Sequence, residues 1–342
     1  MTQSGGDRPV TLAHGNGGLH TRALVDAIFG AALGAQAPDS SRDAGLLPDA
    51  ANARLLMTTD SFTVQPLEFP GGDIGSLAVH GSFNDLAVSG AEPLALSLNV
   101  LVEEGFGIER LGRLARSLAE AAGEVPVICA DTKVLPAGHG GGLYLATTAV
   151  GRLARDPQCP PLGIEQIRAG DQVMVSGPVG DHGTTVMLAR ESFGLSTELR
   201  SDAGSILELV RCIRDLPGLR FMRDPTRGGL ATVCHEVADA TGLGIRLFEE
   251  RIPLRDPVRA VCEMLGLDPL YLACEGRAVA VAEPQLAEHV VNAWRRLPGG
   301  EQAALIGEVF PDPGQAPVRL VTGLGGERLL MPLRDDPLPR IC

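Results

Sequence analysis

The sequence predicts a two-domain protein of the α/β or α+β class. Its 342 residues are enough to form two hydrophobic cores. Hydrophobic residues make up 44% of the chain and aromatic residues only 4%, so we expect cores of Ala, Leu and Val. Helical patterns alternate with short apolar runs that are typical of buried strands. The composition changes around residues 153–170, and we place the domain boundary there.

The first half of the chain alternates predicted strands and helices. The strands are expected at Leu55–Thr59, Leu94–Val102, Val125–Cys129 and Leu143–Val150, and the helices at Ile74–Gly90 and Ile108–Ala122. Asp60 then follows the first strand, at the position where α/β folds place ligands. Asp131 and Lys133 fall in a turn after the third strand, and residues 36–52 are expected to form a loop or linker.

The second half continues this alternation. Strands are expected at Gln172–Ser176, Arg277–Ala282, Ala303–Val309 and Val318–Thr322, and helices from Thr184 and at 203–215, 228–241, 257–266 and 284–297. The loop Gly180–Gly183 feeds one of these helices and is a potential anion site. Asp224 lies between two arginines, Arg223 and Arg227, at the start of another.

Composition excludes several classes of function. No apolar run approaches the 18 residues that a membrane span requires, and the first residues lack the features of an export signal. Seven cysteines without a Cys-x-x-Cys pair favour a reducing cytoplasm over disulfides or zinc. The formal net charge of −13 argues against binding to nucleic acid or to an anionic membrane.

The acidic residues and the glycine-rich loops are the features of the sequence best suited to form a metal-binding or phosphate-binding site. Carboxylates such as Asp60, Asp85 and Asp224 suit Mg²⁺, which binds one or two of them together with substrate phosphates. The loop His14-Gly15-Asn16-Gly17-Gly18 precedes a helical pattern, where backbone N–H groups bind anions. No Walker pattern is present, so we hypothesise an ATP–Mg²⁺ site of another type. Scattered surface acids and a flexible N-terminal loop remain the alternative from spacing alone.

Two residues are unusual for their position. Lys133 is the only lysine among 29 basic residues, and unlike arginine it is readily tuned to lose its proton. Cys342 ends a tail that Pro337 and Pro339 keep extended. The eleven residues from Pro332 onward span about 35 Å when extended, so the thiol can visit more than one site. An ordinary surface thiol is the alternative.

A set of short motifs runs from residue 14 to residue 342. It comprises His14–Gly18, Thr58-Thr59-Asp60-Ser61, Phe69–Gly75, Asn84–Gly90, Gly180–Gly183, Arg223–Gly229 and the terminal Pro339-Arg340-Ile341-Cys342. This set resembles the carbamoyl dehydratase HypE family of hydrogenase maturation proteins. The acids and glycine loops are shared across the aminoimidazole ribonucleotide synthetase-like ATP-binding superfamily, whereas the tail is specific to the HypE family.

The resemblance implies a two-domain α+β fold of the aminoimidazole ribonucleotide synthetase-like type. Its N-terminal domain forms a dimer barrel, its C-terminal domain is mixed α/β, and its C-terminal tail is mobile. The domains expected are a glycine-rich loop and helix at 1–35, an ATP-binding and dimerisation domain at 36–152, an α/β domain at 153–331 and the tail at 332–342.

The resemblance also implies an activity and partners. The enzyme uses ATP to dehydrate the S-carboxamide on its own Cys342 to a thiocyanate, which supplies the cyanide ligand for the iron of nickel–iron hydrogenase. The carbamoyltransferase HypF loads the thiol, and a HypC–HypD complex assembles the iron ligands. The enzyme itself is a homodimer that uses ATP and Mg²⁺ in the cytoplasm.

Site residues carry over by position. Asp60, Asp85 and Asp224 match metal-binding acids, and Cys342 matches the substrate thiol. Lys133 and Glu275 match a proton-handling pair that faces across the cleft. Nucleotide contacts are implied for Asn84, Asp131 and the loop His14, Gly15, Asn16, Gly17 and Gly18. The resemblance gives no role to Asp73.

Two other functions would share parts of this pattern. A selenophosphate synthetase-like enzyme would carry a reactive Cys or selenocysteine in the N-terminal glycine loop, and residues 14–18 contain none. A non-catalytic maturation scaffold would not need the metal-binding acids or Lys133. An ATPase assay separates the scaffold from both enzymes.

Overall fold

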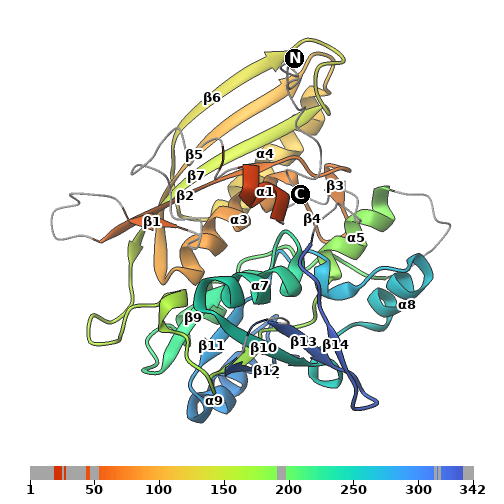
Figure 1. The fold of residues 1–342 in the computed structure, drawn as a ribbon. Helices are drawn as coiled ribbons and strands as arrows, with labels where there is room; N and C mark the ends of the chain where they lie inside the picture. Colours follow the sequence, from red (N-terminus) through yellow and green to blue (C-terminus); the bar gives the residue numbers. More distant parts are fainter. Residues whose placement is uncertain are drawn as a thin grey trace, which may run out of the picture.

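The computed structural model describes residues 19–24, 27, 44–46, 54–190, 198–311, 314 and 317–333. Two β-sheets organise this part of the chain and lie one above the other in Figure 1. Strands between residues 45 and 153 form the first sheet, and strands between residues 172 and 329 form the second. Two sheets with helices packed on each confirm the predicted α+β fold class.

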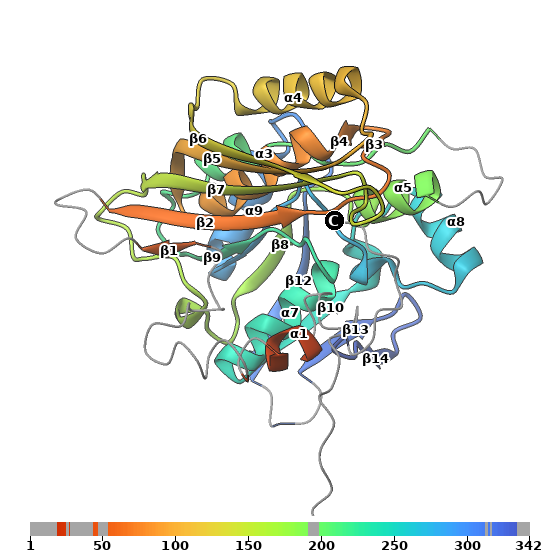
Figure 2. The same ribbon diagram turned by 90° about the horizontal axis from the view of Figure 1, so that it is seen from above.

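The first sheet is five-stranded and consists of β1 (Gly45–Leu46), β2 (Leu55–Phe62), β5 (Ala91–Glu103), β6 (Val127–Leu135) and β7 (Leu143–Leu153). The strand order is β1-β2-β7-β5-β6. Helix α4 (Ile108–Ala122) connects β5 to β6, so these two strands run parallel, as such a crossover requires. The other pairs are antiparallel. Figure 2 shows α4 on one side of this sheet.

Helix α3 (Ile74–Val88) packs between this sheet and α4. Asp73 caps its start: the carboxylate Oδ1 accepts hydrogen bonds from the Gly75 N–H at 2.8 Å and the Ser76 N–H at 3.0 Å. A Cβ on Gly75 would lie 2.2 Å from the carbonyl oxygen of Leu114, so only glycine allows α3 and α4 to approach this closely. Asp73, whose role could not be predicted, therefore initiates the helix that carries Asn84 and Asp85.

The second sheet is seven-stranded, with the order β14-β13-β10-β12-β8-β11-β9. Its strands are β8 (Gln172–Val175), β9 (Leu219–Arg223), β10 (Leu243–Phe248), β11 (Val279–Ala282), β12 (Ala304–Pro311), β13 (Val318–Val321) and β14 (Glu327–Leu329). Helix α7 (Gly229–Thr241) packs on one face through Val233 and Val237. Helices α6 (Leu207–Arg211) and α9 (Pro284–Trp294) pack on the other around the fully buried Trp294.

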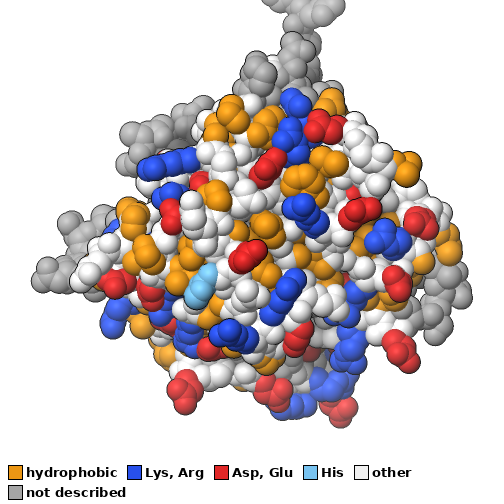
Figure 3. Space-filling view, turned by 90° about the horizontal axis from the view of Figure 1, so that it is seen from below, with side chains coloured by type: hydrophobic (Ala, Val, Ile, Leu, Met, Phe, Trp, Pro, Cys, Tyr) orange, Lys and Arg blue, Asp and Glu red, His pale blue; other side chains and the backbone are white. Residues whose placement is uncertain are grey.

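Shorter elements complete the fold. They are α1 (Leu19–Leu24), α5 (Asp181–Arg190), α8 (Asp256–Leu265), the ribbon of β3 (Glu68–Phe69) and β4 (Gly72–Asp73), and the 3₁₀ helices η4 (Ile164–Gln166), η5 (Glu249–Arg251) and η6 (Pro269–Tyr271). Acidic, basic and apolar side chains are interspersed on the face shown in Figure 3. No helix in the described ranges combines the length and apolar character that a membrane crossing needs.

Pairing between strands corrects two predictions from the sequence. Asp60 lies within β2 and not after its end, because pairing with β7 continues as far as Phe62 and Leu145. Asp131 and Lys133 lie within β6 and not in a turn, because β6 pairs with β5 as far as Leu135. The local sequence predicted that both strands end at these polar residues, but pairing with neighbouring strands continues them further.

The helix predicted at 203–215 is reduced to α6, and strands β9, β10 and β14 were not predicted at all. These strands are short, and arginine interrupts each of them, as in Leu219–Arg223. Their apolar runs are consequently too brief to give a periodic signal.

The face of the first sheet opposite α3 is not covered by any described element. Met57, Asn99 and Leu101 on this face are exposed. Asp131 pairs in register with Asn99, and Lys133 with Leu101, so both side chains lie on the same face. We call this surface the open face. It ends at β6, the outermost strand of the sheet, in which every residue but the last is exposed.

Candidate active site

Three acidic residues, Asp60, Asp224 and Glu275, lie close together between the two halves of the chain, and Asp85 lies on α3 beside β2. Asp60 lies on β2 and Asp85 on α3, both in the first half of the chain. Asp224 directly follows β9, and Glu275 lies in the loop before β11, both in the second half. Asp60, Asp224 and Glu275 are close enough for their charges to interact. Three of these positions, Asp60, Asp85 and Asp224, are the acids that the sequence identified as metal ligands.

Burial and mutual repulsion make these carboxyl groups weaker acids than usual. Burial raises the pKa of Asp224 to about 6, with Arg223 opposing the shift and Asp60 adding to it. Burial also raises the pKa of Glu275 well above its ordinary value, and Asp224, Asp202 and Asp60 add to this shift. The pKa of Asp60 is raised by burial, although Arg227 lies 3.9 Å away and lowers it. A positive charge entering the cluster would favour ionisation of all three.

The acid cluster is better suited to a cation that shares its ligands with phosphate than to a cation enclosed by protein side chains alone. Among the described residues, no three His, Cys, Asp or Glu side chains are grouped closely enough to enclose a metal ion. Mg²⁺ needs only one or two carboxylates and takes its other ligands from water and phosphate oxygens. Asp224, with 5% exposure, and Asp60 beside it meet that requirement.

Asp85 is held by its neighbour on β2. The hydroxyl of Thr58 donates a 2.6 Å hydrogen bond to Oδ2 of Asp85, which fixes the carboxylate against the first sheet. Asp85 remains partly exposed, whereas Asn84 beside it is 1% exposed. The two residues therefore have different surroundings although they are adjacent on one helix.

Asn84 is engaged by backbone groups of the second half of the chain. Its amide nitrogen donates to the carbonyl oxygens of Gly204 at 3.0 Å and Glu275 at 3.2 Å. Its amide oxygen accepts from the N–H of Ile206 at 3.0 Å. These partners differ from the nucleotide contact that the resemblance implies for this residue.

Asp131 and Lys133 are not brought to the acid cluster. The Nζ atom of Lys133 lies 2.6 Å from Oδ2 of Asp131, and both side chains are more than half exposed. This ion pair lies on the open face, whereas Asp60 and Asp85 lie on the side of the sheet that α3 covers. Because the charge of Asp60 acts on Glu275, Glu275 belongs to the α3 side of the sheet, and Lys133, predicted to act with it, lies on the other side within one chain.

The remaining predicted residues, His14, Gly15, Asn16, Gly17, Gly18 and Cys342, lie outside the described residues. The described residues next to them are in contact: the N–H of Leu19 donates to the carbonyl oxygen of Leu333 at 3.2 Å. Leu19 and Leu333, 314 residues apart in the sequence, are therefore neighbours in the described structure.

Sequence reasoning missed Asp202, which lies between the two halves. Its carboxylate accepts hydrogen bonds from the N–H groups of Glu275 at 3.3 Å and Gly276 at 3.2 Å, and its side chain is fully buried. Arg277 lies 3.4 Å from it. The sequence around Asp202 has the composition of an ordinary turn, so no local signal identified it.

The predicted anion loop at Gly180–Gly183 contains a buried carboxylate. Asp181 is 1% exposed, accepts a 2.9 Å hydrogen bond from Nε of Arg255 and lies 3.5 Å from Arg277. Asp181 begins helix α5, and its two arginine partners balance its charge within the fold.

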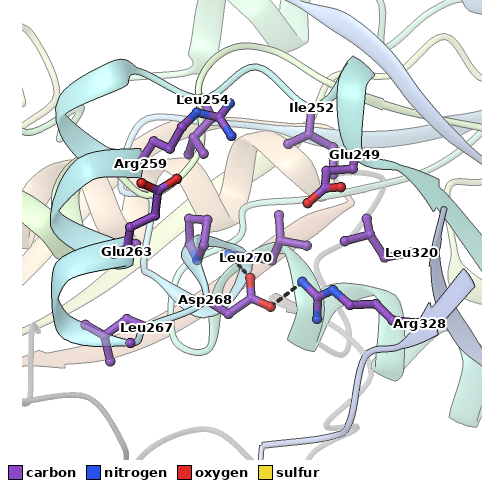
Figure 4. Close-up of a pocket in the computed structure, with 13 residues that line it drawn as sticks. Glu249, Ile252, Leu254, Arg259, Glu263, Leu267, Asp268, Leu270, Leu320 and Arg328 are labelled. Carbon is purple, nitrogen blue, oxygen red and sulfur yellow. Dashed lines mark hydrogen bonds and ion pairs between the residues drawn. The ribbon is translucent and has the colours of Figure 1, made fainter. Parts of the chain in front are cut away.

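A separate pocket of about 320 Å³ lies between α8, η6 and β13. Apolar side chains such as Ile252 and Leu320 line it, and Figure 4 shows Arg328 reaching toward Asp268, 2.6 Å away. None of the predicted site residues lines this pocket.

Comparison with known proteins adds independent findings. Residues 41–153 match the family described as AIR synthase related protein, N-terminal domain, and residues 168–318 match AIR synthase related protein, C-terminal domain. The chain is 42% identical to carbamoyl dehydratase HypE of Azotobacter vinelandii, in an alignment that covers 97% of each protein.

Solved structures give the same result. A crystal structure of a HypE–HypF complex contains a chain that matches with a TM-score of 0.82 and 37% identity, covering 90% of this chain and 99% of that one. A crystal structure of hydrogenase maturation protein HypE in complex with ATP matches with a TM-score of 0.79 and 36% identity, covering 98% of this chain and 100% of that one.

Proposed function

The chain belongs to the carbamoyl dehydratase HypE family, an enzyme family of hydrogenase maturation, and from this premise we propose its reaction and site residues. The enzyme uses ATP to dehydrate an S-carboxamide on its own Cys342 to a thiocyanate. The cyanide group then becomes a ligand of the iron in nickel–iron hydrogenase. The relative solved in complex with ATP supports the choice of nucleotide.

The reaction proceeds in two steps whose atoms balance. The amide oxygen attacks the γ-phosphorus of ATP, the bond from phosphorus to the ADP oxygen breaks, and one N–H proton leaves the nitrogen. The carbon–oxygen bond then breaks with phosphate as the leaving group, and loss of the second N–H proton completes the carbon–nitrogen triple bond. Phosphorylation is necessary because oxide is not a leaving group, whereas phosphate is. The enzyme must therefore bind phosphate and remove protons in one place.

The acid cluster supports this assignment more than any other observation. We assign Asp60, Asp85 and Asp224 to holding Mg²⁺ against the ATP phosphates, where the ion would neutralise phosphate charge. Burial, to which the charge of Asp60 adds, raises the pKa of Asp224, so a cation that entered the cluster would stabilise its ionised form. Thr58 keeps the carboxylate of Asp85 oriented before any ligand arrives. We assign the phosphates themselves to the loop His14–Gly18, and further nucleotide contact to Asp131.

Glu275 is the proposed proton acceptor. The residue is 4% exposed, and burial, with Asp224, Asp202 and Asp60 nearby, raises the pKa of its carboxyl group. A carboxyl group in this setting accepts a proton only once positive charge enters the site. Lys133 would provide such a charge beside Glu275, and it would orient the carboxylate as well.

Lys133 and Glu275 can act together only if Lys133 comes from a second copy of the chain. We propose a homodimer in which the open faces of two copies pack together with an offset, so that the edge strand β6 of one copy carries Lys133 past the edge of the other copy's first sheet toward Glu275. The exposed apolar side chains on that face, Met57 at 42% and Leu101 at 37%, support this arrangement. The outermost strand β6 also presents an edge that requires covering. Asp131 and Lys133 would then lie at the dimer interface.

Further partners follow from the reaction. HypF is proposed to load the carboxamide on Cys342, and the relative solved as a HypE–HypF complex supports this partner. A HypC–HypD complex is proposed to receive the cyanide. The cytoplasm is the proposed location, because the reaction uses ATP and a free thiol.

Intact mass spectrometry tests the proposed function. The chain is incubated with ATP, carbamoyl phosphate and HypF, and the mass is followed with time. We expect a gain equal to one carboxamide, followed by the loss of one water only when ATP and Mg²⁺ are present. A chain that gains the carboxamide but never loses water would be a scaffold and not the dehydratase.

A further inference from the structure

The peptide of Glu275 is held on both sides by residues from distant parts of the chain. Its N–H donates to Asp202, and its carbonyl oxygen accepts from Asn84 and from the N–H of Gly204 at 3.3 Å. The next N–H, that of Gly276, also donates to Asp202. A Cβ on Gly276 would lie 1.8 Å from the carbonyl oxygen of Asp202, so the two backbone segments approach too closely for any side chain at this position.

Asn84 is the only described residue of the first half that hydrogen-bonds to this peptide. Both amide hydrogens and the amide oxygen have backbone partners, at Gly204, Glu275 and Ile206. With 1% of its surface exposed, the side chain can contact a nucleotide only by giving up these bonds. Breaking them would remove the partner of the buried Ile206 N–H and a donor to the Gly204 carbonyl oxygen, which is unfavourable because buried polar groups are costly to leave unpaired.

We infer that Asn84 is a positioning residue: its side chain fixes the peptide of Glu275 relative to α3, and hence relative to Asp85. This inference rests on the proposed function, because it assumes that the carboxyl group of Glu275 takes a proton from the substrate. Asn84 and Asp85 are adjacent on one helix, so the same turn of α3 carries the metal-binding acid and locates the proton acceptor. Asn84 does not touch the nucleotide.

This role differs measurably from a nucleotide contact. Loss of a contact weakens ATP binding and turnover together. Loss of a positioning bond leaves ATP binding intact and lowers turnover, because a displacement of about 1 Å at a catalytic group reduces the rate by about 100-fold. It also changes the surroundings of the Glu275 carboxyl group, which Asp60, Asp202, Asp224 and Arg227 now set.

The test measures ATP affinity, by calorimetry, and the rate of thiocyanate formation, by intact mass, in Asn84→Ala. We expect turnover to fall about 10- to 100-fold with an unchanged Kd for ATP. Asn292→Ala is the matched control, since Asn292 is exposed on α9, and it should change none of these values.

A second variant makes the test independent of the folding of Asn84→Ala. Asp202→Asn keeps the size of the side chain but replaces one acceptor oxygen that the Glu275 and Gly276 N–H groups use. It should give the same lower turnover with unchanged ATP affinity. The inference would be overturned if the Kd for ATP rose in Asn84→Ala by as much as turnover fell. Normal turnover in Asp202→Asn would also overturn it. If the wild-type chain forms no thiocyanate, the proposed function fails instead, and an unchanged Kd in Asn84→Ala still excludes a nucleotide contact.

Discussion

The hydroxyl group of Thr58 donates a 2.6 Å hydrogen bond to the carboxylate of Asp85, which is 27 residues further along the chain. This bond joins β2 to α3 at the level of the acid cluster. It fixes the orientation of the Asp85 carboxylate relative to the first sheet. The first domain thus presents one oriented acid to the cleft before the substrate binds.

Removal of a single acid should abolish catalysis without unfolding the protein. We expect Asp85→Ala and Asp224→Ala to lower Mg²⁺-dependent turnover by at least about 100-fold, because phosphate charge is left uncompensated. Rates of thiocyanate formation and thermal melting curves check this. Glu288→Ala, which removes an exposed acid from α9, is the control and should be fully active. Full activity in both aspartate variants would refute the metal assignment.

Asp224→Asn should stabilise the protein at neutral pH while it inactivates the enzyme. The folded-state pKa of Asp224 is about 6 against an ordinary value of 3.8, so the folded state keeps a proton that the unfolded state has released. The free energy of unfolding of the wild type therefore decreases as pH rises from about 4 to 6. Above that range the variant should be more stable by on the order of 1–3 kcal/mol, and the difference should vanish below pH 4. Denaturant unfolding across pH measures this, and a difference that is constant with pH would contradict it.

Cys342→Ala should prevent both mass changes but leave ATP binding intact, because the thiol is the substrate and does not bind the nucleotide. Intact mass and calorimetry measure the two effects. Cys129→Ala is a suitable control, since Cys129 is also an exposed thiol. Persistence of the carboxamide on Cys129 or Cys274 in the Cys342→Ala variant would show that the tail is not the substrate.

Lys133→Arg should bind ATP normally but form no thiocyanate. Arginine keeps the positive charge, but its pKa above about 12 prevents proton exchange and its planar group has a different shape. If Lys133 only neutralises phosphate charge, the arginine variant should retain most of its activity. Measurement of thiocyanate formation at saturating ATP separates the two roles.

The sequence was sufficient to predict the main elements of the fold. Helix α4 has the predicted limits, Ile108 to Ala122, because its apolar residues repeat with helical spacing over a long segment. Asp60, Asp85 and Asp224 were proposed as metal ligands because each lies in a recognisable motif, and the fold brings Asp60 and Asp224 together although 164 residues separate them in the chain. Residue type and motif were enough to select candidate residues where the signal lies in the local sequence.

Roles that depend on tertiary contacts could not be predicted. Asp202 holds the peptide of Glu275, yet its neighbours in sequence read as a turn. Asn84 lies beside a predicted metal ligand, and only the structure shows that its amide faces the backbone of the other domain. The position of Lys133 was predicted wrongly because pairing with β5, which is a property of the sheet, extends β6 through it.

The position of Lys133 on the open face has a genetic consequence. If each catalytic site takes its lysine from one chain and its glutamate from the other, two different inactive chains can complement each other. Mixing Lys133→Ala with Glu275→Gln chains in equal amounts, with exchange of subunits, makes half of the dimers mixed, and each mixed dimer contains one intact site. About one quarter of wild-type activity should then return, whereas no activity should return if lysine and glutamate come from the same chain.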